Sequence, residues 1–264
     1  MTIVNHQYKF IFIKTQKTAG TSMEISLSKF CNSKDIVCLI KRSDEMLRKK
    51  LKFQGPTNYA YFNTEYLFNF IGFWWLLKNL IKLIPFSKKI FKYKDDPVLE
   101  KISFFAPWQR ILEHNTLEDL KKKITEHQFN NYYKFCIVRH PYDSMISHYW
   151  WEVYKKRFDK DKSFFEFVKQ ESYVHFKNTY DIMFVSDKLL FDKCVKYENF
   201  EHDLKEVSNS INLPENIYNI FKDIKTKHFT RKDKTFNIID NDSKEKIYHD
   251  WKIFFELFDY KKEF

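Results

Sequence analysis

A short stretch near the N-terminus, FIKTQKTAGTSME at residues 12–24, combines cationic and hydroxyl side chains with one of only three glycines in the chain. It follows an apolar run and precedes a helical pattern, so it predicts a turn between a strand and a helix. A helix N-terminus binds anions through its exposed N–H groups and its dipole. Gly20 allows a close backbone approach, and Lys17 supplies a mobile positive charge. The residues expected to contact a phosphate-like group are Lys17, Gly20, Thr21 and Ser22.

Two alternatives to this interpretation stay open. The stretch lacks the GxxxxGK[ST] pattern of nucleoside triphosphatases, because no Ser or Thr follows a Gly-Lys pair. This disfavours a P-loop nucleotide or small-molecule kinase, which is the alternative enzyme, and it favours phosphate-site chemistry without a metal. Thr21 and Glu24 also have the spacing of a capping box, so an ordinary capped helix is the alternative without a ligand.

A second group of reactive residues accompanies a later apolar run, in FCIVRHPYDSMISHY at residues 135–149. Arg139 stands at the end of the run, and Ser147 comes eight residues later. Pro141 suits the first turn of a helix, which would bring Ser147 about two turns from its start. A guanidinium fork and a hydroxyl can bind a second, separate phosphate. The alternative is an arginine paired with a carboxylate and a serine that faces solvent.

The elements that must position these two groups alternate between strand and helix. Apolar runs predict strands at 8–13, 35–40, 134–139 and 194–200. Helical patterns begin at Thr21, Thr116 and Pro141, and three more cover 200–211, 214–224 and 243–258. This alternation predicts an α/β fold with a central, mainly parallel sheet flanked by helices.

The composition describes a folded, basic protein. Hydrophobic residues make up 44% of the 264-residue chain and aromatic residues 19%, well above a disordered chain. The formal net charge of +11 favours an anionic partner. The lysines are scattered and no reading element for bases is recognisable, so no nucleic acid is expected. Four cysteines without a CxxC pair, and a start without a signal peptide, predict a reduced, cytoplasmic protein.

We expect one domain over residues 1–264, with an insertion at about 41–105. Within it, the segment 67–94 is apolar, aromatic and lysine-rich, and Lys78 and Lys82 interrupt its apolar run. The segment favours a buried amphipathic helix, with membrane-surface contact as the alternative and a membrane span least favoured. A peripheral membrane protein without catalysis is therefore the non-enzymatic alternative. Membrane association is also compatible with an enzyme whose acceptor is a lipid.

Taken together, the two groups resemble a known family. KTAGTS after an apolar strand, and VRHPYDSMISHY with a serine eight residues beyond its arginine, are similar to the sulfotransferases that use 3′-phosphoadenosine 5′-phosphosulfate (PAPS). The likeness is closest to the carbohydrate branch that includes heparan sulfate 2-O- and 6-O-sulfotransferases. Weaker likenesses reach residues 197–204 and 249–260. The resemblance implies a P-loop-like three-layer fold without a metal, with PAPS as donor and 3′-phosphoadenosine 5′-phosphate (PAP) as product.

The resemblance also implies roles for individual residues. The first loop would hold the 5′-phosphosulfate through Lys17, Thr18, Gly20, Thr21 and Ser22. The 3′-phosphate would be held by Arg139 and Ser147, with Arg231 or Lys232 from the basic segment 229–234. Lys17 would neutralise the leaving phosphate, and His114 would act as general base toward the acceptor hydroxyl. The acceptor is expected to be a carbohydrate or glycolipid, bound by insertions at 41–105 and 155–190.

Overall fold

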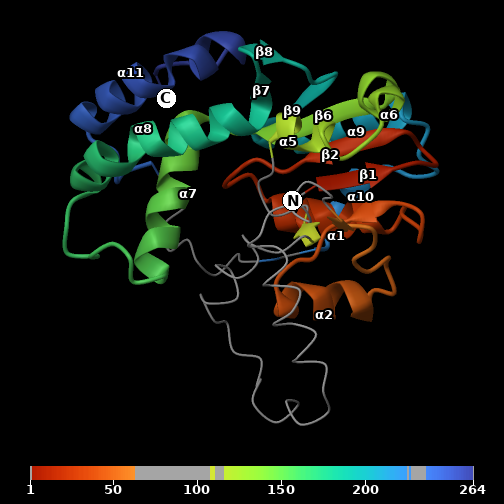
Figure 1. The fold of residues 1–264 in the computed structure, drawn as a ribbon. Coiled ribbons are helices and arrows are strands. Elements are labelled where there is room, and N and C mark those ends of the chain that lie inside the picture. The colour runs from red at the N-terminus through yellow and green to blue at the C-terminus, as the bar shows by residue number, and fades with distance from the viewer. Residues whose placement is uncertain (1, 63–107, 111–115, 225, 227–235, 264) are drawn as a thin grey trace, which may run out of the picture.

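The computed structural model describes residues 2–62, 108–110, 116–224, 226 and 236–263. Its centre is a five-stranded sheet in the order β3-β1-β2-β6-β9 (Figure 1). The strands are β1 (Thr2–Asn5), β2 (Phe10–Ile13), β3 (Ile36–Val37), β6 (Tyr133–Val138) and β9 (Lys193–Lys196). β2 and β6 are mostly apolar and buried, as expected for strands covered on both faces.

Within this sheet all strands except β1 run in the same direction. β2 pairs in parallel with β6, and β6 pairs in parallel with β9. β1 pairs antiparallel with both β2 and β3. The mainly parallel sheet expected from the sequence is therefore present, with β1 as the exception. Because β2 and β6 are parallel neighbours, the segments that follow them leave the sheet at the same edge.

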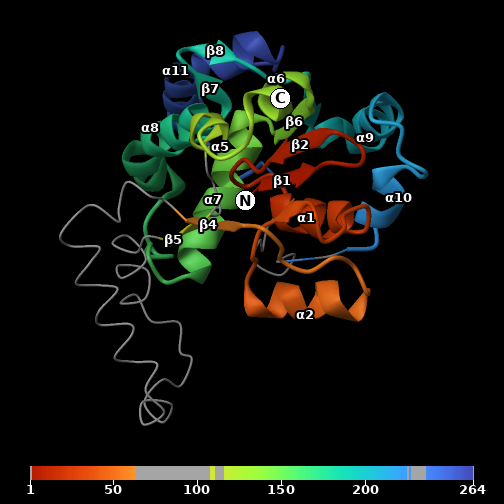
Figure 2. The ribbon, with the colours of Figure 1, turned by 45° about the vertical axis from the view of Figure 1, so that its right-hand side comes forward.

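Helices cover both faces of the sheet (Figures 1 and 2). Phe10 and Phe12 face α1 (Gly20–Ser28), α9 (Phe200–Ser210) and α10 (Ile217–Phe221). Ile11 and Ile13 face the other way, toward α5 (Leu117–Lys121) and α6 (Glu126–Asn131). Alternation along β2 thus divides its side chains between two helical layers. All nine residues of α1 are buried.

A further group of helices packs beside the sheet and carries the largest core. α7 (Pro141–Tyr154), α8 (Phe164–Met183) and α11 (Asn241–Leu257) share this core with Cys136 and Val138 of β6. Figure 1 shows the three helices together on the left, away from α1 and α2 (Arg42–Lys50). α7 follows β6 directly, so this group positions the second strand-to-helix turn.

The structure differs from the sequence predictions in local ways. β2 begins at Phe10, because Lys9 has a left-handed backbone with φ 51°. The strand expected at 194–200 ends at Lys196 and continues as a 3-10 turn at Tyr197–Asn199. The segment 155–190, expected as an insertion, consists mainly of α8, followed by β7 (Phe184–Val185) and β8 (Lys188–Leu189). The helix expected at 214–224 is the shorter α10.

The expected insertion at 41–105 is described only in part. It contains α2 and the short strand β4 (Ala60–Phe62), which pairs antiparallel with β5 (Trp108–Arg110). The segment 67–94 lies outside the described residues, so its predicted helix stays a prediction. In the part of the chain that the structure describes, no helix is both long and apolar enough to cross a membrane.

Candidate active site

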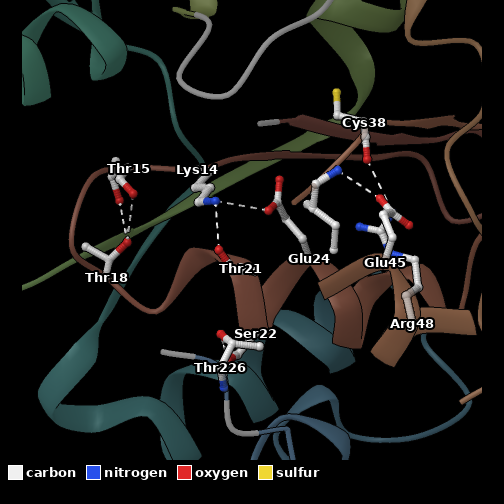
Figure 3. Close-up of polar contacts among 11 residues, drawn as sticks. Lys14, Thr15, Thr18, Thr21, Ser22, Glu24, Cys38, Glu45, Arg48 and Thr226 are labelled. Atoms are coloured by element: carbon white, nitrogen blue, oxygen red, sulfur yellow. Dashed lines mark hydrogen bonds and ion pairs between the residues drawn. The ribbon is translucent and has the colours of Figure 1, made fainter. Parts of the chain in front are cut away.

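The loop between β2 and α1 has a tight, strained backbone. Lys17 and Ala19 are both left-handed, with φ of 60° and 55°, which costs energy in residues other than glycine. The hydroxyls of Thr15 and Thr18 lie 2.9 Å apart, and Thr18 donates to the Thr15 carbonyl over 3.1 Å (Figure 3). The Thr15 hydroxyl also donates to the carbonyl of Ile137 on β6. These bonds hold the loop against the neighbouring strand.

The start of α1 differs from the expected capping box. The helix begins at Gly20, one residue before Thr21, and no side chain of the described residues caps it. Thr21 and Glu24 instead both accept hydrogen bonds from Lys14 Nζ, over 3.0 and 3.3 Å (Figure 3). Because the Lys14 ammonium is buried, it needs these two oxygens as partners. The capping-box prediction is therefore wrong.

Gly20 makes room for the Lys14 side chain. A Cβ on residue 20 would lie 2.4 Å from Cγ of Lys14, closer than two non-bonded carbon atoms can approach unless one of them moves. Lys14 is 6% exposed and its ammonium is held by Glu24. Lys17 is half-buried. The two lysines of the loop thus have different environments, and Lys17 is the one near solvent.

The Lys17 ammonium is one of three that surround a single indole ring. Its Nζ lies 4.8 Å from the ring centroid of Trp151 on α7. The Nζ atoms of Lys41 and Lys155 lie 5.0 and 5.1 Å from the same centroid. Trp151 is half-buried, whereas Lys41 and Lys155 are exposed. The electron-rich ring face attracts the cations, and it brings positive charge from three segments to one place.

Arg139, at the end of β6, connects the second group to the loop. Its Nη1 donates to the Lys17 carbonyl over 2.8 Å, and its Nε donates to Asp143 Oδ2 over 2.5 Å. The guanidinium also lies over the ring of Tyr197, 4.1 Å from its centroid. The alternative prediction, that Arg139 pairs with a carboxylate, is therefore confirmed, and the carboxylate is that of Asp143. Nη2 forms no hydrogen bond with the described residues, so it is the guanidinium nitrogen that still has donors to offer.

The hydroxyls expected to contact phosphate already have protein partners. Thr18 bonds within the loop, and Thr21 accepts from Lys14. The Ser22 hydroxyl lies 2.8 Å from that of Thr226 and accepts from the Thr226 N–H over 3.4 Å. Ser147 is half-buried on α7 and has no hydrogen bond to the described residues, nor does the structure link it to Arg139. The structure therefore brings Arg139 and the loop into contact, and the expected role of Ser147 stays a prediction.

Two histidines beside the second turn are held neutral. Burial, and secondarily the charge of Lys17, lower the pKa of His148 from 6.5 to about 4. Burial likewise lowers the pKa of His140 to about 4. The His140 side chain accepts from the Tyr142 N–H at the start of α7 and so caps the helix after the turn. Both rings are therefore uncharged near neutral pH.

Two of the predicted functional residues lie outside the described residues. His114, the expected base, falls in 111–115, and Arg231 falls in 227–235. Their roles stay predictions. The described chain does include Thr226, which contacts Ser22 in the first turn of α1.

Sequence reasoning missed several residues of this site. Asp143 has a signal, because it lies four residues after Arg139 on a helix, where opposite charges pair. Tyr197 directly follows β9, the next parallel strand. Its position after a strand is the one sequence feature that could have identified it. Gln16 hydrogen-bonds His175, which is far from it in the chain. No local pattern connects these last two residues.

A group with metal-ligand atoms lies elsewhere, on α9. His202, Asp203 and Glu206 each offer an atom within 4.8 Å of the others. Lys193 already pairs with both carboxylates, over 3.6 Å to Asp203 and 2.5 Å to Glu206. We therefore interpret these three residues as part of an ion-pair network with Lys193 of the edge strand β9, and not as a metal site.

A parallel α/β sheet whose strand-to-helix loop faces a basic side chain from the next strand is typical of proteins that bind phosphorylated nucleotides. A family model described as "Sulfotransferase family" matches residues 1–261, so the chain belongs to the sulfotransferase family. An uncharacterized protein of Archaeoglobus fulgidus is 33% identical over 102 residues, 37% of this chain and 82% of the archaeal protein. No solved structure matches the chain significantly. Family membership confirms the resemblance to sulfotransferases and favours sulfuryl transfer over the kinase alternative.

Proposed function

We propose that this sulfotransferase takes its sulfuryl group from PAPS and transfers it to a hydroxyl of a saccharide or glycolipid. The observation that carries the proposal is the hydrogen bond from Arg139 Nη1 to the Lys17 carbonyl. It makes the two strand-end groups neighbours. A nucleotide with a 5′-phosphosulfate and a 3′-phosphate needs two separate anion-binding groups, and Lys17 and Arg139 are suited to be their centres.

The loop fits the 5′ end of such a donor. Left-handed Lys17 and Ala19 turn the chain sharply into α1, whose first-turn N–H groups have no partner within the helix. Because α1 is buried along its length, little water screens its dipole there. The Nη2 of Arg139, which has no hydrogen bond to the described residues, would donate to the 3′-phosphate as a charge-assisted hydrogen bond.

The residues of the chain would assist the transfer by charge and by proton movement. The donor supplies a sulfuryl group bonded to a phosphate, which is the leaving group. Lys17 would neutralise the negative charge that grows on that phosphate as the sulfur–oxygen bond breaks. His114 would accept the proton of the acceptor hydroxyl as its oxygen bonds to sulfur. Trp151, packed beside Lys17, would exclude water from one side of the reacting group.

The surroundings of Lys17 also bear on the acceptor. Trp151 and Tyr154, whose rings stack with centroids 5.9 Å apart, form an aromatic pair of the kind found in sugar-binding sites, and Lys41 and Lys155 add positive charge around Trp151. A saccharide that carries carboxylate or sulfate groups would match this combination of aromatic face and ammonium groups. We therefore propose an acidic saccharide, free or lipid-linked, as the acceptor.

A thermal-shift titration tests the donor assignment. PAP should raise the melting temperature, because a ligand that binds only the folded state stabilises it by about 2.7 kcal/mol at one hundred times its Kd. Adenosine 5′-monophosphate, which lacks the 3′-phosphate, should raise the melting temperature less. ATP with Mg²⁺ is the control for the kinase alternative. A folded protein that millimolar PAP leaves unshifted would exclude the donor assignment.

The acceptor assignment needs a separate measurement. With sulfur-labelled PAPS, a panel of acidic polysaccharides, neutral polysaccharides and glycolipids should show label in the acidic saccharides. Lys41→Ala and Lys155→Ala should raise the KM for such an acceptor and leave PAP binding unchanged. Equal labelling of neutral and acidic saccharides would contradict the acidic acceptor while leaving the donor assignment intact.

A further inference from the structure

His175, in the middle of α8, is almost completely buried and contacts the donor loop. The side chain is 1% exposed. Its Nδ1 lies 3.1 Å from Oε1 of Gln16, the residue before Lys17. Its Nε2 lies 2.9 Å from the hydroxyl of Ser144 on α7. One ring therefore connects α8, α7 and the loop.

The partners of His175 define which nitrogen carries the proton. A carboxamide oxygen such as Gln16 Oε1 only accepts, so Nδ1 must donate. In a neutral ring Nε2 is then the acceptor, and the Ser144 hydroxyl donates to it. Stacking fixes the plane of the ring, since His148 lies parallel to it at 4.5 Å and Trp251 packs on it at 5.3 Å. The Nδ1–H is thus aimed at Gln16 by its surroundings.

The loop needs such external restraints because its backbone is strained. A left-handed lysine persists only where neighbouring groups over-determine its conformation. Arg139 holds the carbonyl of Lys17, and His175 holds the side chain of the preceding residue. The strained peptide is therefore fastened on both sides, from β6 and from α8.

We propose that His175 is a positioning residue of the donor loop, which through Gln16 holds the Lys17 backbone in its strained conformation. The proposal rests on the proposed function for its catalytic meaning, since Lys17 is the group being positioned. His175 acts through Gln16 and contacts neither donor nor acceptor. It supplies the order that lets Lys17 meet a developing charge without reorganisation.

Two substitutions of the same residue separate positioning from packing. In His175→Asn the amide nitrogen is bonded to Cγ, as Nδ1 is, so it can still donate to Gln16. In His175→Gln the amide nitrogen is one bond farther out, at the place of Nε2, and the donor toward Gln16 is lost. Both variants lose the stacked ring, so both should lower global stability in urea by similar amounts.

Hydrogen exchange of the free protein, measured on a peptide that covers residues 12–24, is the decisive experiment. His175→Gln and Gln16→Leu should each speed exchange in this peptide about fivefold, as the loss of one buried hydrogen bond predicts. His175→Asn should stay within about twofold of the wild type. The double variant His175→Gln/Gln16→Leu should exchange no faster than either single variant. Equal exchange in the Asn and Gln variants, or additive effects in the double variant, would overturn the proposal.

Ligand binding then distinguishes this proposal from the donor assignment. If PAP binds the wild type, its Kd should rise, by at most about fivefold, in His175→Gln and Gln16→Leu but not in His175→Asn, because a loop that is ordered for less of the time binds less tightly. If PAP does not bind the wild type, the donor assignment fails. The exchange comparison still decides the role of His175 in that case.

Discussion

Arg139 Nη1 donates to the carbonyl of Lys17 over 2.8 Å. The two residues are far apart in the chain, and each stands after a strand of the same parallel pair, β2 and β6. The contact means that the arginine expected to bind one phosphate also supports the backbone of the lysine expected to bind the other. A change at Arg139 should therefore also affect the backbone conformation of Lys17.

Arg139→Ala should weaken PAP binding about 10–100-fold, the range for losing hydrogen bonds to a charged group. Adenosine 5′-monophosphate should also bind more weakly, but by a smaller factor, because it loses only the support of the loop. Calorimetric titration of both nucleotides, below the melting temperature of the variant, measures the two factors. An equal loss for both nucleotides would remove Arg139 from the 3′-phosphate site.

Lys17→Ala should mainly lower activity, whereas Lys14→Ala should mainly lower stability. Lys17→Ala should lower kcat at least about 100-fold if Lys17 acts on the leaving group as proposed, and should leave the free energy of unfolding nearly unchanged, because Lys17 is only half-buried. Lys14→Ala should destabilise the fold by about 3–5 kcal/mol, since Glu24 stays buried without its cation. Urea unfolding and initial rates together test the pair. A Lys17→Ala enzyme with normal kcat would exclude the assigned role.

Gly20→Ala should destabilise the protein by about 1–3 kcal/mol, the usual cost of adding a methyl group to a packed site. The added Cβ would lie 2.4 Å from Lys14 Cγ and push the lysine away from Thr21. Gly55→Ala is the matched control, because a Cβ there meets nothing within 4 Å. Urea midpoints that fall equally in the two variants would show that the Lys14 contact is not the cause.

Acid should destabilise the protein in part through His148. Its folded-state pKa, about 4, lies below the usual 6.5, so the folded protein binds the proton more weakly than the unfolded chain. The resulting stability is present above pH 6.5 and is lost as the pH falls toward 4. Between pH 7.5 and 5.0 the loss should be about 2 kcal/mol. His148→Gln should lose about 2 kcal/mol less than the wild type over this interval, measured by urea unfolding at both pH values.

His114→Ala should lower kcat about 10²–10⁴-fold if this residue is the general base, with little change in PAP affinity. The rate of the wild type should fall as the pH drops below the pKa of the base, and the residual rate of the variant should lack this step. The measurement is kcat against pH for both proteins. Full activity of His114→Ala at neutral pH would transfer the role to another group.

The sequence predicted the strand-to-helix turns better than the contacts within them. Apolar runs and Pro141 identify β6 and α7, because burial and helix-start geometry act over a few residues. The capping box at Thr21 and Glu24 was wrong, since buried Lys14, which directly follows β2, donates to an oxygen of each of them. The partner of Thr21 and Glu24 depends on which side chain lies beside them in the folded loop. The spacing of residues along the chain does not predict that contact.

Longer-range relationships were out of reach for the same reason. α8 carries a capping-box pair, Ser163 and Glu166, yet the whole segment was interpreted as an insertion. The bond between His175 and Gln16 then depends on how α8 packs against the sheet. Local patterns describe elements, and the contacts that shape the loop come from elements distant in the chain.

The complete burial of α1 affects how the protein should respond to ionic strength. Dissolved ions weaken attractions between exposed charges. Because all residues of α1 are buried, ions can approach this helix only at its end, and they screen its dipole little. Lys41 and Lys155, by contrast, are exposed and fully accessible to counterions. Rising salt should therefore weaken the binding of a polyanionic acceptor much more than the binding of the nucleotide. At high salt the enzyme would then still bind its donor but no longer bind its acceptor.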